Sequence, residues 1–407
     1  MAVNLTNPST IHAVGGVELG GLSAGIKKSG DLDLVIVALP ESSSTAAVFT
    51  RNAYCAAPVT VAREQLASCN GAVRALLINS GGANAATGEP GLAAAREHCA
   101  RVAEQLQLPA DSVLPFSTGV IGEQLPTAKM LDGIDNLVSA GLSESAWLDA
   151  ATGIMTTDTQ PKLASTQLTL DGQAISISGF AKGSGMIQPN MATMLAYMFT
   201  DAEVAGSDLT ALLQDVTERS FNSITVDGDT STNDSFVLSA TGSSGAKLSP
   251  ASPHWQAFAD AIQAVALQLA QALVRDGEGA SKFITVNVTG GSSEAMCQRV
   301  GLTVGNSPLV KTAFFASDAN LGRIVMAVGR SEVEGLQLDR LTLRIGDTSV
   351  IRQGQPDPDY TDALGQQEMA AEEIELHIDL GLGSASWTCW TCDLSHDYVS
   401  INADYRS

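Results

Sequence analysis

The sequence predicts an α+β protein built from layers of sheet and helix. Short apolar runs typical of strands occur in pairs joined by turns, as in residues 31–48 and 166–180. Two longer segments, 91–107 and 253–275, carry apolar residues at helical spacing. Because the strands follow one another in hairpins more often than in regular strand–helix–strand units, α+β layers are favoured over a doubly wound sheet.

In the first half of the chain, two strands are expected within 31–48, separated by a Ser-rich turn at 42–44. A third strand at 73–78 precedes the Gly/Asn-rich loop 79–84, and a helix follows at 91–107. After the loop 117–122, helical segments run to about residue 153. The dipeptide Asp171-Gly172 then predicts the turn of a hairpin across 166–180.

The segment 182–200 joins two stretches of opposite character. Residues 182–189 form a loop, since Gly183 and Gly185 permit unusual dihedral angles and Pro189 fixes its own. The apolar run that follows Thr193 is typical of a fully buried strand. Thr193 therefore lies at the mouth of a strand, where a catalytic hydroxyl would be both rigid and reachable. A β-branched residue that merely begins a strand fits the same pattern.

The second half alternates helices and strands in the same way. A helix is expected at 208–220, a polar loop at 227–234, and a strand at 236–240. The long helix 253–275 ends before Gly277, and another strand begins at 282–288. Strands and one or two helices alternate from there to the end.

Composition excludes several classes of protein. The formal charge of -22 argues against a nucleic-acid partner, because phosphate binding needs clustered Lys and Arg. The first twenty residues lack the basic start and apolar core of a signal peptide, and no run of 18 apolar residues suggests a membrane span. Six scattered cysteines do not make a disulfide framework. A cytoplasmic protein is expected.

Several short motifs are weak. The pattern G-x-S-x-G at 21–25 would need a strand before it and a helix after it to be a hydrolase elbow, but it lies near the N-terminus and leads into a stretch that does not begin a helix. The loop 79–84 matches no phosphate-binding pattern, and 227–234 lacks calcium-loop spacing, which favours a hydrogen-bonded structural loop. Cys389 and Cys392 lie in a strand-like run that directs their thiols to opposite faces. The five histidines show no ligand spacing, so no metal site is expected, and a nucleophile that supplies its own base fits better.

Longer motifs carry a resemblance to a known family. They are 155–159 (MTTDT), 181–186 (AKGSGM), 189–195 (PNMATML), 227–234 (DGDTSTND) and 401–407 (INADYRS). From about residue 15 onward the chain resembles the ornithine acetyltransferases, the glutamate N-acetyltransferases of the arginine-biosynthesis acetyl cycle. The resemblance implies a layered αββα catalytic domain at 1–282 and a smaller α+β domain at 283–407, whose tail returns to the active site.

The resemblance also implies a set of site residues. The chain would cleave itself between Ala192 and Thr193, leaving Thr193 as an N-terminal nucleophile with its own α-amine as base. Thr118 and Gly119 would form the oxyanion hole. The amino-acid substrate would bind to Thr156, Lys182, Thr193, Glu278, Asn402 and Ser407. A carboxylate suits Lys182 and an ammonium suits Glu278, although each of these residues also fits a surface or capping role.

The implied reaction is acetyl transfer from N2-acetylornithine to L-glutamate through acetyl-Thr193, with no metal or organic cofactor. Use of acetyl-CoA as a second donor would make the enzyme bifunctional. The family suggests a heterotetramer of two alpha chains (1–192) and two beta chains (193–407). An N-terminal-nucleophile aminopeptidase or amidase of related fold is the alternative, and a non-enzymatic binding protein is a more distant one.

Overall fold

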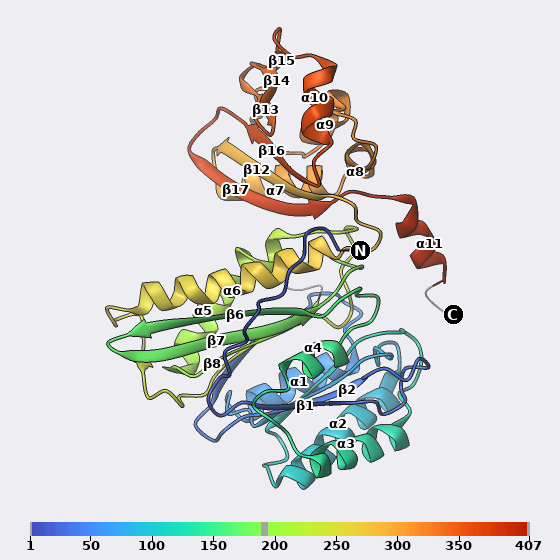
Figure 1. Cartoon of the computed structure of the whole chain (residues 1–407), viewed down its shortest axis with the longest axis vertical. Coiled ribbons are helices and arrows are strands. Elements are labelled where there is room, and N and C mark those ends of the chain that lie inside the picture. The colour runs from blue at the N-terminus through green and yellow to red at the C-terminus, as the bar shows by residue number, and fades with distance from the viewer. Residues whose placement is uncertain (1, 189–193, 405–407) are drawn as a thin grey trace.

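The computed structural model describes residues 2–188 and 194–404. Two stacked sheets form the body of the molecule (Figure 1). The first has the order β1-β2-β4-β5, with β1 (Glu18–Leu22), β2 (Leu34–Ala38), β4 (Ala75–Asn79) and β5 (Val113–Ser117). The second has the order β3-β10-β8-β7-β6, with β3 (Ser44–Phe49), β10 (Ser235–Ala240), β8 (Leu195–Thr200), β7 (Gln173–Lys182) and β6 (Lys162–Leu170).

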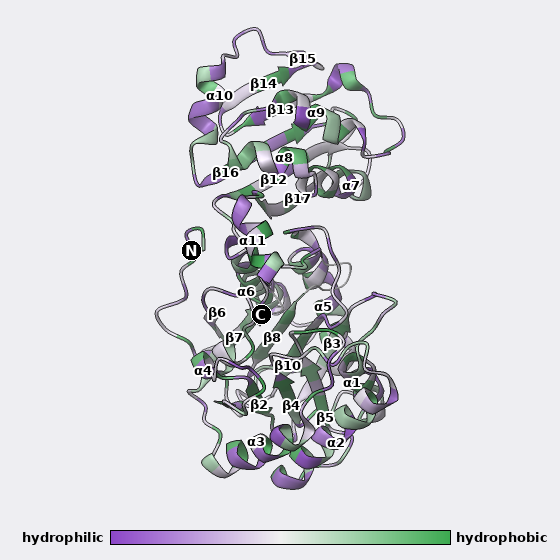
Figure 2. Ribbon diagram, turned by 90° about the vertical axis from the view of Figure 1, so that its right-hand side faces the viewer, coloured by the Kyte–Doolittle hydropathy of each residue, from purple (hydrophilic) through white to green (hydrophobic). Residues whose placement is uncertain are grey.

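Strand periodicity explains why these sheets have two apolar faces each. In β2, Val35 and Val37 belong to the core between the sheets, whereas Leu34 and Ile36 belong to the core on the opposite face. This is the alternation that a pleated strand imposes on successive side chains. From the second sheet, Phe180, Tyr197 and Phe199 fill the space between the sheets. The central strands are mainly hydrophobic (Figure 2).

Helices cover the outer faces. α2 (Gly88–Leu106) and α3 (Thr127–Ala140) pack on the first sheet. α5 (Gly206–Glu218) and α6 (Trp255–Arg275) pack on the second. α1 (Ala57–Ser68) and α4 (Trp147–Gly153) lie beside the edge strands β5 and β1. The body is therefore an αββα sandwich, and the predicted α+β class is confirmed.

By length and composition, α6 alone among helices in the described part of the chain could cross a membrane. Half of its apolar window is buried inside the protein. Phe258, Ile262, Leu269 and Leu273 belong to the core against the second sheet. A core helix of a globular protein passes the same test of length and hydropathy, so this helix is weak evidence for a span.

A third sheet is stacked above the body (Figure 1). Its order is β15-β14-β13-β16-β12-β17, with β12 (Phe283–Gly291), β13 (Thr342–Ile345), β14 (Thr348–Arg352), β15 (Gln355–Pro356), β16 (Glu373–Asp379) and β17 (Ala385–Cys392). Its helices are α7 (Glu294–Gly305), α8 (Pro308–Phe315), α9 (Leu321–Gly329) and α10 (Asp362–Met369). The division into domains at 282/283 stays a prediction.

Short elements complete the chain. They are β9 (Glu203–Val204), β11 (Lys247–Leu248), the 3-10 turns η1 (Phe221–Ser223) and η2 (Leu338–Arg340), and the terminal helix α11 (His396–Asp404). After β17, α11 leaves the third sheet and runs back beside the body (Figure 1). Its place next to the body brings the tail within reach of the loops at the ends of β7 and α6.

Three local predictions are confirmed by the backbone. The hairpin β6–β7 turns at Asp171 and Gly172, whose φ angles of 50° and 82° are those of a type I′ turn. Cys389 lies in the core of the third sheet and Cys392 in the core of the body, so the thiols do face apart. Both cysteines are free. β8 is buried along its full length, as its apolar sequence predicts.

The rejection of a hydrolase elbow at 21–25 is also explained. The loop after β1 wraps around the buried Asp33, whose carboxylate accepts hydrogen bonds from the backbone N–H groups of Ala24, Ile26 and Lys27. The segment is thus a loop held by hydrogen bonds to an aspartate, and no helix follows Ser23 directly.

Candidate active site

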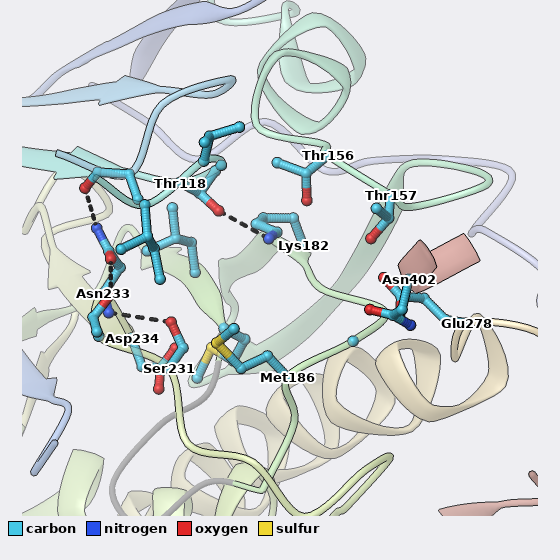
Figure 3. A pocket seen from close by; sticks show the side chains of 18 residues that line it. Thr118, Thr156, Thr157, Lys182, Met186, Ser231, Asn233, Asp234, Glu278 and Asn402 are labelled. Carbon is cyan, nitrogen blue, oxygen red and sulfur yellow. Dashed lines mark hydrogen bonds between the residues drawn. The ribbon is translucent and has the colours of Figure 1, made fainter. Parts of the chain in front are cut away.

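A cavity of about 290 Å³ lies where loops from both sheets and the tail converge (Figure 3). Its lining comes from the loop after β5, the end of β7, the start of β8, the loop before β10, the segment after α6, and α11. Six of the predicted site residues line it: Thr118, Gly119, Thr156, Lys182, Glu278 and Asn402. Ala192, Thr193 and Ser407 lie outside the described residues, but Met194 and Leu195 are part of the lining.

Thr118 and Gly119 follow β5 and present hydrogen-bond donors to the cavity. Lys182 Nζ donates to Thr118 Oγ1 over 3.0 Å. Because an ammonium group only donates, the Thr118 hydroxyl must accept here and keeps its own proton available. No described group accepts a hydrogen bond from Gly119 N–H. The two donors needed for an oxyanion hole are therefore present and unused.

Only glycine fits at position 119. Its φ angle is 127°, in the region that L side chains rarely adopt. A Cβ atom there would lie 2.4 Å from the backbone carbon of Gly81, which cannot move aside as a flexible side chain can. The close approach of the two backbones fixes where Gly119 N–H points.

A fully buried charge network supports the wall that carries Lys182. Lys162 Nζ contacts Asp158 Oδ1 at 2.5 Å and Asp276 Oδ2 at 2.7 Å, and all three side chains are fully buried. Asp158 also accepts from the backbone N–H groups of Thr156 and Gly183. Burial alone would raise the pKa of Asp158, but the ammonium groups of Lys162 and Lys182 hold it well below its usual value. Asp158 is therefore an anion that ties the predicted substrate residues Thr156 and Lys182 together.

Lys182 itself is a desolvated cation at the cavity wall. Burial lowers its pKa, and the neighbouring ammonium of Lys162 adds to that effect, while the carboxylate of Asp158 opposes it. A cation that has lost water on one side binds an anionic ligand group more strongly than a fully hydrated one. Lys182 can thus receive a carboxylate.

Glu278 and Asn402 form the part of the cavity that the tail contributes. Asn402 Nδ2 donates to Glu278 Oε2 over 2.7 Å, and Glu278 N–H donates to Ser184 O over 2.8 Å. Gly185 makes room for this carboxylate, because a Cβ there would lie 2.5 Å from it. Glu278 is only 8% exposed, so an ammonium group of a ligand would be its natural partner.

Asp227 holds the tail against the loop after β7. Its carboxylate accepts from Met186 N–H at 2.5 Å, from Ile187 N–H at 2.7 Å, and from the Tyr398 hydroxyl at 3.2 Å. Tyr398 lies one helical turn before Asn402 in α11. The structural role predicted for the loop 227–234 is therefore confirmed for Asp227.

The far end of the same loop has a different role, which sequence reasoning missed. Ser231, Asn233 and Asp234 line the cavity on the side opposite Glu278 and Asn402 (Figure 3), and Thr232 is also part of the lining. Asn233 is fixed by hydrogen bonds from its Nδ2 to Ala83 O and Ser117 O. Thr157 and Met186 are further lining residues that were not predicted. The only sequence signal for Asp234 is its place just before the strand 235–240.

The cation of Lys182 and the carboxylate of Glu278, on separate parts of one cavity, suit a zwitterionic ligand. Within 2–188 and 194–404, no three His, Cys, Asp or Glu side chains are grouped so that they could hold a metal ion. The chemistry that the arrangement offers is binding of a small amino acid beside two free hydrogen-bond donors.

Comparison with known proteins gives a family over nearly the whole chain. Residues 18–407 match the model of the ArgJ family. The chain is 50% identical over 411 residues to the arginine biosynthesis bifunctional protein ArgJ of Pseudomonas fluorescens (strain Pf0-1), covering 100% of both chains.

Solved structures of similar proteins include two with related names. One is the ArgJ protein of Bacillus halodurans, 38% identical, covering 50% of this chain and 95% of that one with a TM-score of 0.48. The other is the ornithine acetyltransferase of Mycobacterium tuberculosis complexed with ornithine, 35% identical, covering 45% and 94% with a TM-score of 0.39. On the full-length sequence match, this chain belongs to the ArgJ family.

Proposed function

We propose that this chain, as an ArgJ-family acyltransferase of arginine biosynthesis, transfers an acetyl group from N2-acetylornithine to L-glutamate through Thr193. The observation that carries the proposal is that Thr118, Gly119, Lys182 and Glu278 line one cavity. Met194, the residue that follows Thr193 in the sequence, lines it too. These residues come from three distant parts of the sequence. Their convergence matches the site that the family resemblance implies.

The reaction begins with self-cleavage. The Thr193 hydroxyl attacks the carbonyl carbon of Ala192, the peptide becomes an ester, and water releases it. Thr193 then carries a free α-amine, whose ordinary pKa of about 7.7–8.0 makes it a base near neutral pH. An N-terminal threonine can thus activate its own hydroxyl, and no histidine is needed.

Transfer follows as a double displacement. The Thr193 oxygen bonds to the acetyl carbon of N2-acetylornithine, and ornithine leaves with a proton. Glutamate then attacks acetyl-Thr193 through its amino group and departs as N-acetylglutamate. Gly119 N–H and the Thr118 hydroxyl would stabilise the oxyanion in both steps, and loss of one such donor typically costs on the order of 100–1000-fold in rate.

Lys182 and Glu278 would orient both substrates, because N2-acetylornithine and glutamate each carry groups of both charges. Thr156, Asn402 and Ser407 are proposed as further polar partners. The reaction as written needs no cofactor, and acetyl-CoA would be a second donor to the same Thr193. We further propose a cytoplasmic enzyme of two alpha and two beta chains, with the catalytic domain ending near residue 282.

Incubation with N2-acetylornithine, with and without glutamate, tests this function. We expect N-acetylglutamate only when glutamate is present, and little free acetate in its absence. An aminopeptidase or amidase of related fold would pass the acyl group to water and release acetate in both samples. That result would replace transfer by hydrolysis.

The role of Thr193 is tested separately by two substitutions. Thr193→Ala should abolish both self-cleavage and transfer, because one hydroxyl serves both reactions. Thr193→Ser should keep some cleavage, since serine retains the hydroxyl and loses only the methyl group that holds χ1. Two bands from the alanine variant on a denaturing gel would show that the cleavage assignment is wrong.

A further inference from the structure

One oxygen of the buried Asp234 carboxyl group lacks a hydrogen-bond partner among the described residues of the cavity wall. Asp234 is 2% exposed and lines the cavity, and its Oδ2 is the oxygen without a partner. Of the other carboxylates buried at or beside the site, Asp158 and Asp276 are both paired with Lys162, and Glu278 accepts a hydrogen bond from Asn402. A buried carboxyl oxygen without a partner costs folding free energy, so its presence calls for a reason.

The position of Asp234 is fixed by the pairing of two parallel strands. Ser235 of β10 is in register with Leu195 of β8, and Ser235 N–H donates to Met194 O over 2.8 Å. Asp234 therefore lies beside Met194, the residue that immediately follows Thr193 in the sequence. The side chain thus flanks the strand end to which the scissile peptide is attached.

The surroundings of Asp234 favour the protonated form of its carboxyl. Burial raises its pKa well above the usual value, and the groups that oppose this do so only in part. Those groups are the Ser231 hydroxyl and N–H, the ammonium of Lys182 on β7, and the N–H of Met194 just before β8. A neutral carboxylic acid is a proton donor, which an asparagine at the same position would not be.

A purely structural role explains the backbone of Asp234 and the part of its carboxyl that accepts from Ser231 and Met194, but it leaves Oδ2 unexplained. The carbonyl oxygen accepts from Thr50 N–H over 2.9 Å, which joins the start of β10 to the end of β3. Any residue could make this backbone bond. The carboxyl contributes no hydrogen bond through Oδ2 to the described part of the protein.

We propose that Asp234 is the general acid of self-cleavage, donating a proton to the Thr193 nitrogen as the peptide bond to Ala192 breaks. The inference rests on the proposed function, because it takes Thr193 as the nucleophile. The Thr193 oxygen bonds to the Ala192 carbonyl carbon, and the carbon–nitrogen bond breaks. The nitrogen gains the proton of Asp234, and the proton lost by the hydroxyl returns to the Asp234 carboxylate. Water then hydrolyses the ester.

The test uses the full chain with Thr193→Ser, which is expected to cleave slowly enough for the precursor to be followed. In this background, cleavage should slow as the pH rises, because only the protonated carboxyl can donate. Adding Asp234→Asn should lower the cleavage rate by about 100-fold, the low end of what a positioned acid contributes, and should remove that pH dependence. Intact mass measured over time gives both quantities.

Asp201→Asn is the matched control. Asp201 is also buried, follows the other end of β8, and has a pKa raised by burial, but it does not line the cavity. Its substitution should leave the cleavage rate unchanged. Should Asp234→Asn not fold, as judged by its thermal transition, Asp234→Ser takes its place.

Wild-type cleavage with unchanged pH dependence in either folded variant would overturn the assignment. Failure of both variants to fold would also overturn it, by making the side chain a structural requirement. If the chain without any substitution is never cleaved, the proposed function itself fails. A cleaved wild-type chain with a normal Asp234→Asn variant overturns only the inference.

Discussion

The two walls of the cavity treat buried charge in opposite ways. Beneath Thr156 and Lys182, the carboxylates of Asp158 and Asp276 share the ammonium of Lys162, and every one of these side chains is fully buried. On the wall before β10, Asp234 is buried with an unpartnered oxygen. Paired charges fix the shape of a site, whereas an unpaired ionisable group is a common mark of chemistry. The difference separates the scaffold of the site from its reactive part.

Lys162→Met should produce the largest effect on stability. It leaves Asp158 and Asp276 buried without their cation, which typically costs about 3–5 kcal/mol. Urea unfolding of the Thr193→Ala chain, which stays in one piece, should show a much lower midpoint. Lys247→Met is the control, because its ion pair with Glu203 is exposed and such pairs contribute about 0–1 kcal/mol.

Urea unfolding of the Thr193→Ala chain also compares the stability contribution of the two walls. Asp234→Asn should leave the midpoint unchanged or raise it, because it removes a buried ionisable group whose Oδ2 has no partner among the described residues. A loss as large as that of Lys162→Met would show that the two walls are equally structural.

Lys182→Met should affect catalysis more than stability. It removes the cation that we assign to the substrate carboxylate and keeps an unbranched stem of similar reach. Since a hydrogen bond to a charged group contributes about 1.5–3 kcal/mol, kcat/KM for acetylornithine should fall by roughly 10- to 100-fold. Asp158 keeps Lys162, so the urea midpoint should move little. Wild-type steady-state kinetics would remove Lys182 from the site.

Deleting residues 402–407 should separate the two reactions. Self-cleavage needs only the 192–193 peptide and its donors, and should stay largely intact. Transfer should fall by a larger factor, because the substrate loses Asn402 and Ser407 as polar partners worth about 1 kcal/mol or more each. The cleaved fraction and kcat/KM for acetylornithine are measured on the same preparation. Unchanged transfer would make the tail a structural appendage.

Tyr398→Phe should give the smallest effect. It removes the hydroxyl that joins α11 to Asp227 but keeps the ring. The loss of about 0.5–1.5 kcal/mol in docking of the tail should raise KM by roughly two- to tenfold, with kcat and self-cleavage near wild type. A change in kcat alone would place Tyr398 in the chemistry instead of the tail contact.

The features that depend on local sequence pattern could be predicted from the sequence. The hairpin turn at Asp171-Gly172, the buried strand β8 and the opposed thiols of Cys389 and Cys392 follow from periodicity and turn preference. The six described site residues followed from the family resemblance, and the structure brings them into one cavity. Their roles in catalysis and binding stay predictions.

Long-range contacts were beyond the sequence alone. Lys162 and Asp276 are 114 residues apart, and no local signal pairs them. Asp227 and Asp234 belong to one polar loop, yet the first closes a backbone turn and the second faces the cavity. Only the register of β10 against β8 distinguishes them. Sequence pattern identifies polar loops, and tertiary packing decides which of their residues react.

The most direct test of the account is the intact mass of the purified protein, alone and after addition of N2-acetylornithine. We expect two fragments, 1–192 and 193–407, and an increase of one acetyl group on the second fragment alone. Addition of glutamate should remove that increase. A single uncleaved chain of 407 residues, or two fragments that never gain an acetyl group, would contradict it.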